Sequence, residues 1–397
     1  MKSKAKKTFP LSVLCLFLAS AALLAFVAAI VVTAHLSGSD IIEDPDLRQG
    51  LSLYFNKPAR SITHEDLLRV RAVKIDGSTV FIGGEEIVSG TKKNYALDVT
   101  DTESVLSLDE YYHTISFSAP ITDLSFLSLF ENLEILSVNN CSAFQSLEDV
   151  SRFEKLYELS VQNTQTPILS LSPLSGMTGL VSLSLFNISL TDLSPLASMT
   201  QLSRLHLPAG EISDLSALSS LTSLRLLSLP MNNVRDLSAL ETLSSLQYLD
   251  LSDNEVVEVS PLSSLVELRY LTLANTSENT ENTVQNNVSD ITALSELKKL
   301  EFLYLNYNPL SSLSPLSSLQ KLSATELDCC SIQDVSALSA LAKLRSLSLR
   351  DNEITDVSPL AELTELDYLY LDGNDTLTDT AILSKLEDTV IDIFEDA

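Results

Sequence analysis

The side chains best suited to binding chemistry in this sequence are aromatic and acidic residues in its second half. Six of the eleven tyrosines fall between Tyr248 and Tyr370, at positions that alternate with leucines as on one face of a strand. Tyrosine combines a large apolar area with a hydroxyl group, which suits it to anchoring a partner. The predicted ligand-binding patch comprises Tyr248, Asp250, Tyr270, Phe302, Tyr304, Tyr307, Glu326, Asp328, Tyr368 and Tyr370. Tyrosine is also a good strand former on a half-exposed face, which is the purely structural alternative.

Few residues are arranged as catalysis requires. The four histidines, His35, His64, His113 and His206, show no spacing typical of metal ligands. No glycine-rich phosphate loop or nucleophile elbow occurs. His206 beside Arg204 is the one candidate, and a surface histidine is the simpler interpretation. We therefore predict that the chain is not an enzyme and has no cofactor.

A regular series of aspartates raises the alternative of metal binding. A row of carboxylates suits calcium, but each of these residues also precedes a Ser or Thr by two positions, where it can cap a helical turn. We favour capping and predict no metal site. The series is Asp192, Asp214, Asp236, Asp290, Asp334 and Asp356.

These residues are positioned by a repeated unit, most regular at Leu344–Leu363, LRSLSLRDNEITDVSPLAEL. Most units begin 22 residues after the previous one, and the unit after Leu268 begins 32 residues later. Such a period indicates a solenoid, because one unit cannot bury its leucines alone. The first leucine of each unit is Leu133, Leu156, Leu180, Leu202, Leu224, Leu246, Leu268, Leu300, Leu322, Leu344 and Leu366.

Each consensus position has a physical role. The leucines fill the core, and an asparagine eight residues after the first leucine can bond free backbone groups of the turn. Ser-Pro pairs such as Ser358-Pro359 are typical of a helix N-cap followed by proline. The asparagine position holds Asn232, Asn254, Asn308, Asn352 and Asn374, with Cys141 and Cys330 in two other units.

The consensus L-x-x-L-x-L-x-x-N-x-I-x-D-L-S-P-L resembles the leucine-rich repeat class, and more narrowly the bacterial, internalin-like family with 22-residue repeats. The resemblance extends from about Asp44 to the C-terminus. It implies an α/β leucine-rich repeat solenoid, a curved horseshoe with a parallel sheet on the concave face, 3₁₀ or short helical turns on the convex face and a helical N-terminal cap. The Ig-like domain and wall-attachment modules common in the family are not found, so roles in invasion are not carried over.

The N-terminal segment indicates export. Lys2, Lys4, Lys6 and Lys7 precede an apolar run, and residues 1–36 are predicted to be a transmembrane anchor or a cleaved signal peptide. The lysines favour a cytoplasmic N-terminus with the repeats outside the cell. Residues 37–43 are predicted to be a linker.

The remaining chain divides at changes in the repeat pattern. We predict an N-terminal cap at 44–77, an insertion of a hairpin plus a helix at 78–110, leucine-rich repeats at 111–379 and a C-terminal cap at 380–397. The hairpin is expected to pair 79–82 with 85–88, and Ile115 and Phe117 to start a degenerate coil. A polar insertion at 275–289, NTSENTENTVQNNVS, is expected to be a surface loop.

Charge and cysteines restrict the partners. The net charge of −28 argues against nucleic-acid binding, which requires a basic surface. The four cysteines show no pattern of a disulfide framework or zinc site.

The sequence thus predicts a membrane-tethered, extracellular repeat protein, or a secreted form, that binds a protein or a glycan on its concave face. Two alternatives are a regulatory subunit similar to phosphatase regulators with 22-residue repeats, which the export signal disfavours, and an enzyme that uses the insertion.

Overall fold

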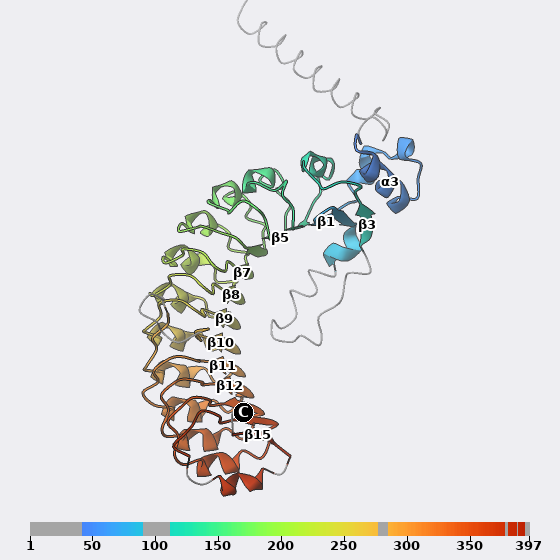
Figure 1. The fold of residues 1–397 in the computed structure, drawn as a ribbon. Coiled ribbons are helices and arrows are strands. Elements are labelled where there is room, and N and C mark those ends of the chain that lie inside the picture. Colours follow the sequence, from blue (N-terminus) through green and yellow to red (C-terminus); the bar gives the residue numbers. More distant parts are fainter. Residues whose placement is uncertain (1–41, 90–111, 277–284, 378–379, 387, 394–397) are drawn as a thin grey trace, which may run out of the picture.

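Stacking of the leucine-rich units produces a curved solenoid (Figure 1). The computed structural model describes residues 42–89, 112–276, 285–377, 380–386 and 388–393. Within these residues, the strands form one 15-stranded sheet in the order β15-β14-β13-β12-β11-β10-β9-β8-β7-β6-β5-β4-β1-β2-β3. Neighbouring strands from β15 to β1 are parallel and line the inner side of the curve. The predicted fold class is confirmed.

Each unit contributes one short strand. The repeat strands are β1 (Ala72–Asp76), β4 (Ile135–Asn139), β5 (Glu158–Gln162), β6 (Ser182–Leu185), β7 (Arg204–His206), β8 (Leu226–Ser228), β9 (Tyr248–Asp250), β10 (Tyr270–Thr272), β11 (Phe302–Tyr304), β12 (Ala324–Glu326), β13 (Ser346–Ser348), β14 (Tyr368–Tyr370) and β15 (Val390–Asp392).

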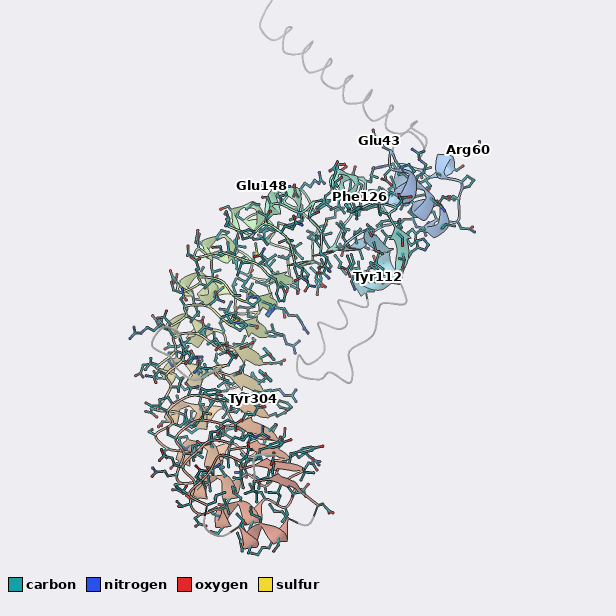
Figure 2. The ribbon with its side chains drawn as sticks, viewed as in Figure 1. Glu43, Arg60, Tyr112, Phe126, Glu148 and Tyr304 are labelled. Atoms are coloured by element: carbon teal, nitrogen blue, oxygen red, sulfur yellow. The ribbon has the colours of Figure 1, made fainter. Side chains whose placement is uncertain are left out.

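Short 3₁₀ helices return the chain along the outer side of the curve. They are η3 (Ser125–Leu129), η4 (Leu147–Asp149), η5 (Ser172–Leu174), η6 (Ser194–Leu196), η7 (Ser216–Ser220), η8 (Ser238–Thr242), η9 (Ser260–Ser264), η10 (Thr292–Glu296), η11 (Ser314–Ser318), η12 (Ser336–Ala340), η13 (Ser358–Glu362) and η14 (Ala381–Lys385). In Figure 2, Tyr304 lies on the strand side and Glu148 on this outer side.

The leucines of each unit form one continuous core. Leu344, Leu347 and Leu349 are fully buried, and Leu347 pairs in register with Thr325 on one side and Leu369 on the other. Burying one leucine stabilises by about 2 kcal/mol. Each coil buries the leucines of its neighbours. The outward-facing side of each terminal coil must therefore be covered by other elements.

The asparagines form the expected ladder inside the turns. The Asn254 side-chain nitrogen donates to the carbonyls of Leu229 (2.8 Å) and Ser252 (3.1 Å), while its Oδ1 accepts from the Val234 N–H (2.9 Å). The same pattern recurs at Asn232, Asn308, Asn352 and Asn374. At the equivalent position, the Cys330 thiol donates to the Leu305 carbonyl at 3.2 Å. Each of these coils is thereby tied to the one before it.

The aspartate series caps the 3₁₀ helices, as favoured from the sequence. Asp236 Oδ1, for example, accepts from the Ser238 N–H at 2.9 Å. The predicted role of the Ser-Pro pairs as an N-cap and first turn was wrong by one position, because Ser194 is itself the first residue of η6 and Leu193 is its N-cap. The aspartate two residues earlier supplies the capping oxygen that a serine N-cap would have supplied.

Two helices cover the N-terminal end of the core. Helix α3 (Pro45–Tyr54) is capped by Asp44, whose side chain accepts from the Leu47 N–H, and it buries Leu47 and Leu51. A capping box formed by Thr63 and Asp66 starts helix α4 (His64–Leu67). A short 3₁₀ helix, η1 (Ala59–Ser61), connects them. The helical cap and the strand spacing at β1 agree with the sequence.

The hairpin lies elsewhere than predicted. Strand β2 (Thr79–Gly83) pairs antiparallel with β1, placing Ile82 opposite Val73, and residues 85–89 are helical. The pairing of 79–82 with 85–88 was therefore wrong. Ile115 belongs to β3 (His113–Ser116), which pairs antiparallel with β2 and so does not start a repeat coil. The helix predicted within the insertion, expected at residues 104–112, lies outside the described residues except for Tyr112.

The expected surface loop at 275–289 was wrong at both ends, which are partly buried in the core, and residues 277–284 lie outside the described residues. Asn275 and Asn286 are buried, and Val288 is fully buried. Asn286 takes the ladder position of its coil, donating to the carbonyls of Leu251 and Leu273. Asn275 Oδ1 accepts from the Asn286 N–H at 2.9 Å. This pair closes the chain across residues 276–285, which are therefore the ten inserted residues.

At the C-terminal end, residues predicted to form a cap continue the stacking of the repeats. The helix η14 precedes β15, which pairs parallel with β14. Val390 on this last strand is 58% exposed, as expected where stacking ends.

The predicted membrane segment at 1–36 lies outside the described residues. Among the residues that are described, no helix combines the length and apolar character needed to cross a bilayer.

Candidate functional site

The strand register brings four predicted patch residues together. Tyr248, Tyr270 and Phe302 occupy equivalent positions on β9, β10 and β11. The rings of Tyr248 and Tyr270 stack at 4.2 Å between centroids and 9° between planes. On β11, the ring centroids of Tyr304 and Phe302 lie 5.4 Å and 6.2 Å from that of Tyr270. We call these four half-buried rings the aromatic cluster.

Carboxylates flank the aromatic cluster. Asp250 on β9 accepts from the Ser252 N–H (3.0 Å) and from the Ser228 hydroxyl (3.1 Å). Glu326 on β12 is exposed and accepts from the Asn306 side chain at 2.8 Å. Burial, with the neighbouring phenol and Glu326, raises the pKa of Tyr304 to about 12. The phenols therefore remain protonated hydrogen-bond donors at neutral pH.

Tyr368 and Tyr370 form a separate group on β14. Their rings are parallel at 6.5 Å, and the Arg350 guanidinium lies 4.2 Å above the Tyr370 ring. The small residues Ala324 and Ser346 occupy the intervening strands. Three strand spacings of about 4.8 Å separate β14 from β11, so the predicted patch is divided in two.

The structure places Tyr307 and Asp328 beyond the strands. Tyr307 has a φ of 58° in the turn, and its carbonyl accepts from the Asn275 side chain. Asp328 accepts from the Ser348 hydroxyl (2.6 Å) and the Arg350 N–H (2.9 Å), and burial raises the pKa of its carboxyl group. These contacts give Asp328 a role in joining adjacent turns.

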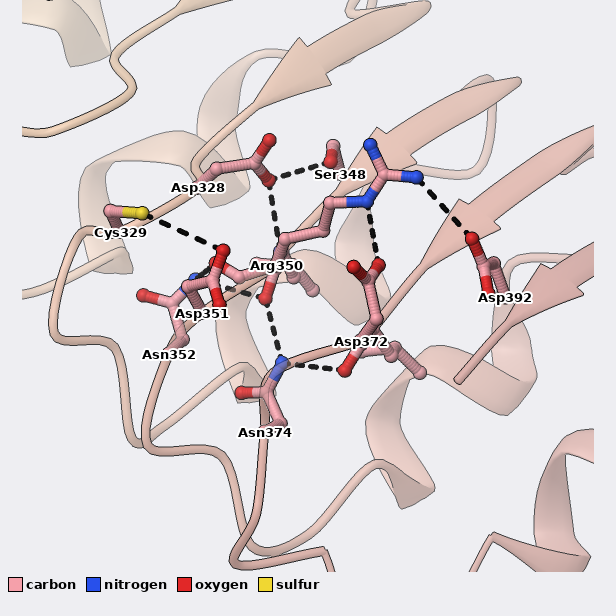
Figure 3. A network of polar contacts seen from close by, with 11 residues as sticks. Asp328, Cys329, Ser348, Arg350, Asp351, Asn352, Asp372, Asn374 and Asp392 are labelled. Carbon is pink, nitrogen blue, oxygen red and sulfur yellow. Dashed lines mark hydrogen bonds and ion pairs between the residues drawn. The ribbon is translucent and has the colours of Figure 1, made fainter. Parts of the chain in front are cut away.

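Arg350 was missed in the sequence although it organises the C-terminal turns (Figure 3). Its Nε donates to Asp372 at 2.6 Å and its Nη2 to Asp392 at 3.3 Å. Aligning the units would have found it, because Asp328, Arg350 and Asp372 occupy the same position in successive units and alternate in charge.

His206 lies on the concave face beside the aromatic cluster. Its ring contacts Phe186 edge-to-face at 4.9 Å. Burial lowers the pKa of His206, against a smaller opposing effect of Asp250, so the imidazole is neutral at pH 7. His206 and Arg204 line a shallow concavity together with Tyr248, Asp250 and residues of β6 and β8.

Comparison with known proteins places the fold. The family model described as leucine-rich repeats (two copies) matches residues 342–385, and no curated protein sequence matches the chain. An internalin of Listeria monocytogenes, InlF, is 25% identical, with a TM-score of 0.64 over 91% of this chain and 98% of that one. The functional domain of InlJ from the same organism is 17% identical, with a TM-score of 0.53 over 89% of this chain and 78% of that one.

A more distant similarity extends to a plant peptide hormone receptor, RGFR1, solved in complex with RGF2. It is 17% identical, with a TM-score of 0.53 over 68% of this chain and 48% of that one, which supports the solenoid fold alone. The repeats and the sheet show that the chain is a leucine-rich repeat solenoid, similar to the Listeria internalin InlF.

Proposed function

We propose that this chain is an extracellular interaction protein that binds a protein partner through its concave aromatic cluster. The observation that carries the proposal is the contact of Tyr270 with Tyr248, Phe302 and Tyr304 on three consecutive strands. Other inner positions nearby are small, such as Ala324 and Ser346. Clustered aromatic rings on an exposed sheet supply the apolar anchors that dominate protein interfaces.

The concave sheet suits this role because its backbone is already rigid. The rings are held by their strands and by each other, so a partner would order few side chains on binding. Asp250 and Glu326 would form part of the polar rim and favour partners with basic residues. Tyr368 and Tyr370 provide a second contact for a partner long enough to span the intervening strands.

We also propose that residues 1–36 tether the chain to the cell membrane with the repeats outside, or direct its secretion after cleavage. The lysines before the apolar run support this orientation. Protease treatment of intact cells tests it, because exposed repeats would be degraded while a cytoplasmic marker survives. Repeats that resist protease until the cells are lysed would contradict the proposal.

The binding proposal is tested by capture of extracellular proteins on the immobilised chain. The double variant Tyr270→Ser/Tyr304→Ser should lose the captured partner, while Leu169→Ser, which removes a 69% exposed apolar side chain away from the named strands, should retain it. Melting curves establish that both variants are folded. Equal capture by the wild type and the double variant would refute the assignment of the aromatic cluster.

A further inference from the structure

The concavity beside the aromatic cluster has the features of a binding site of its own. It lies over strands β6 to β9, and its lining includes Arg204, His206, Leu226, Tyr248 and Asp250. Arg204 and His206 stand on β7, Leu226 on β8, and Tyr248 and Asp250 on β9. Arg204 and His206 are therefore two strand spacings, about 10 Å, from Tyr248 and Asp250, with Leu226 between them.

The Tyr248 ring forms an apolar wall of this concavity. Tyr270, from β10, stacks on one face of the ring at 4.2 Å. Since β8 lies on the opposite side of β9, the other face of the ring is directed over Leu226 and into the concavity. The stacking partner holds the ring upright, so a ligand can pack against a surface that is already in place.

The polar groups around this wall are mixed in charge. Asp250 accepts from the backbone and hydroxyl of Ser252 through Oδ1, and from the Ser228 hydroxyl through Oδ2. Of the roughly four acceptor positions of a carboxylate, three are used and one on Oδ2 remains. Neutral His206 offers one donor and one acceptor nitrogen, and Arg204 contributes a cation.

This combination fits a neutral ring that carries hydroxyl groups. A flat aromatic wall packs against the C–H face of such a ring, and its hydroxyls can donate to Asp250 while accepting from Arg204 or His206. A strongly charged ligand would meet a like charge at one end. We propose that the concavity binds one pyranose unit of a glycan, a site that goes beyond the proposed protein-binding surface.

Saturation-transfer NMR on the full chain tests the proposal. The probes are methyl β-glucopyranoside, methyl α-mannopyranoside, methyl β-galactopyranoside and N-acetylglucosamine, with N-acetylarginine amide as the charged alternative. Irradiating the aromatic protons excites tyrosines, phenylalanines and histidines only, because the chain has no tryptophan. We expect transfer to the C–H protons of at least one sugar.

Variants locate the contact. Tyr248→Leu removes the wall and should weaken sugar binding about tenfold, equivalent to about 1.4 kcal/mol. Asp250→Thr, which copies the residue in register on β10, should weaken it as well. Phe81→Leu, which removes a ring on β2, in the same sheet but remote from β6 to β9, should have no effect.

Three results would overturn the proposal: no transfer to any sugar, equal transfer in wild type and Tyr248→Leu, or transfer to N-acetylarginine amide alone. The outcome is separable from that of the protein-binding test. If a sugar binds but no protein is captured, the glycan site is supported and the protein-binding proposal is refuted. If a protein is captured but no sugar binds, only the glycan site is refuted.

Discussion

At the scale of single residues, the asparagine ladder is the contact on which the coils that carry it depend. Asn232 is 3% exposed and its side chain bonds the Leu207 and Leu229 carbonyls and the Ile212 N–H. These backbone groups are buried and have no water to replace the amide. An unsatisfied buried group costs about 1–3 kcal/mol.

We predict that Asn232→Ala lowers the free energy of unfolding by about 3 kcal/mol, measured by urea denaturation. Asn233→Ala is the matched control, because Asn233 is the exposed neighbour in the same coil and its replacement should change stability little. Similar effects of the two substitutions would show that the ladder amide does not support the coil.

How well a residue's structural role can be predicted from the sequence also differs between residues. Asn232 and Asn254 could be placed because their distance from the first leucine of the unit is constant. Asn286 could not, since ten extra residues separate it from that leucine and hide an identical set of contacts. Tyr307 was assigned to the patch by composition, yet its left-handed backbone places it in a turn.

At the scale of the element, each 3₁₀ helix depends on the aspartate before it. Hydrogen bonds from the Ser238 backbone and side chain lower the pKa of Asp236. A carboxyl group whose pKa is lower in the folded state than its unfolded value of 3.8 stabilises the fold at pH values above 3.8. This contribution to stability is lost as the pH falls through the folded-state pKa. Stability that depends on these caps is therefore lost in acid.

We predict that Asp236→Ala destabilises the protein at pH 7, and that its stability difference from the wild type shrinks as the pH falls below 3.8. The check is the melting temperature of both proteins across this range. Glu241→Gln removes an exposed acid from the same coil and serves as the control. A difference that stays constant with pH would contradict capping by the carboxylate.

The inserted segment is a second feature at this scale. Removing residues 276–285 joins Asn275 to Asn286 and restores a 22-residue unit with its ladder asparagine in place. Shortening a loop changes closure entropy only slightly. We predict that the deletion variant folds with a stability within about 1 kcal/mol of the wild type.

Circular dichroism and urea denaturation of the deletion variant provide the measurement. Asn286→Ala in the full-length chain is the comparison, and it should destabilise by about 3 kcal/mol because it removes a ladder amide. A deletion variant as unstable as Asn286→Ala would show that the inserted residues themselves support the core.

The sequence was less informative where strands pair outside the repeat. Strand β1 matched the repeat spacing, which predicts parallel pairing with a repeat strand. Its antiparallel pairing with β2 on the other side was therefore not predicted. The alternation of Val80 and Ile82 fits the pairing with β1 as well as it fits the predicted hairpin. Only the observed register, with Ile82 opposite Val73 and Val80 opposite Ile75, shows that the buried sides of both strands face the same core.

At the scale of the whole molecule, acidic residues greatly outnumber basic residues. The chain carries 53 acidic and 25 basic residues, and several arginines are engaged with carboxylates, as Arg269 is with Glu301 at 2.8 Å. Most of the acidic residues therefore have no cation of their own to balance them. Their mutual repulsion opposes the compact state.

We predict that the melting temperature rises when ionic strength increases from about 0.01 M to about 0.15 M, which shortens the Debye length from about 30 Å to about 8 Å. Screening weakens the repulsion more than it weakens the fewer ion pairs. Differential scanning calorimetry in sodium chloride measures this effect. A melting temperature that falls with salt would mean that the ion pairs outweigh the repulsion.

The pairing of Asn275 with Asn286 has a consequence for how such a protein can change. In this coil the ladder asparagine occupies the same place in space as in its neighbours, although ten more residues precede it in the unit. With the two amides joined at 2.9 Å, the stretch between them can lengthen or vary without disturbing the stack. The position between Asn275 and Asn286 is thus suited to grafting a foreign peptide onto the scaffold.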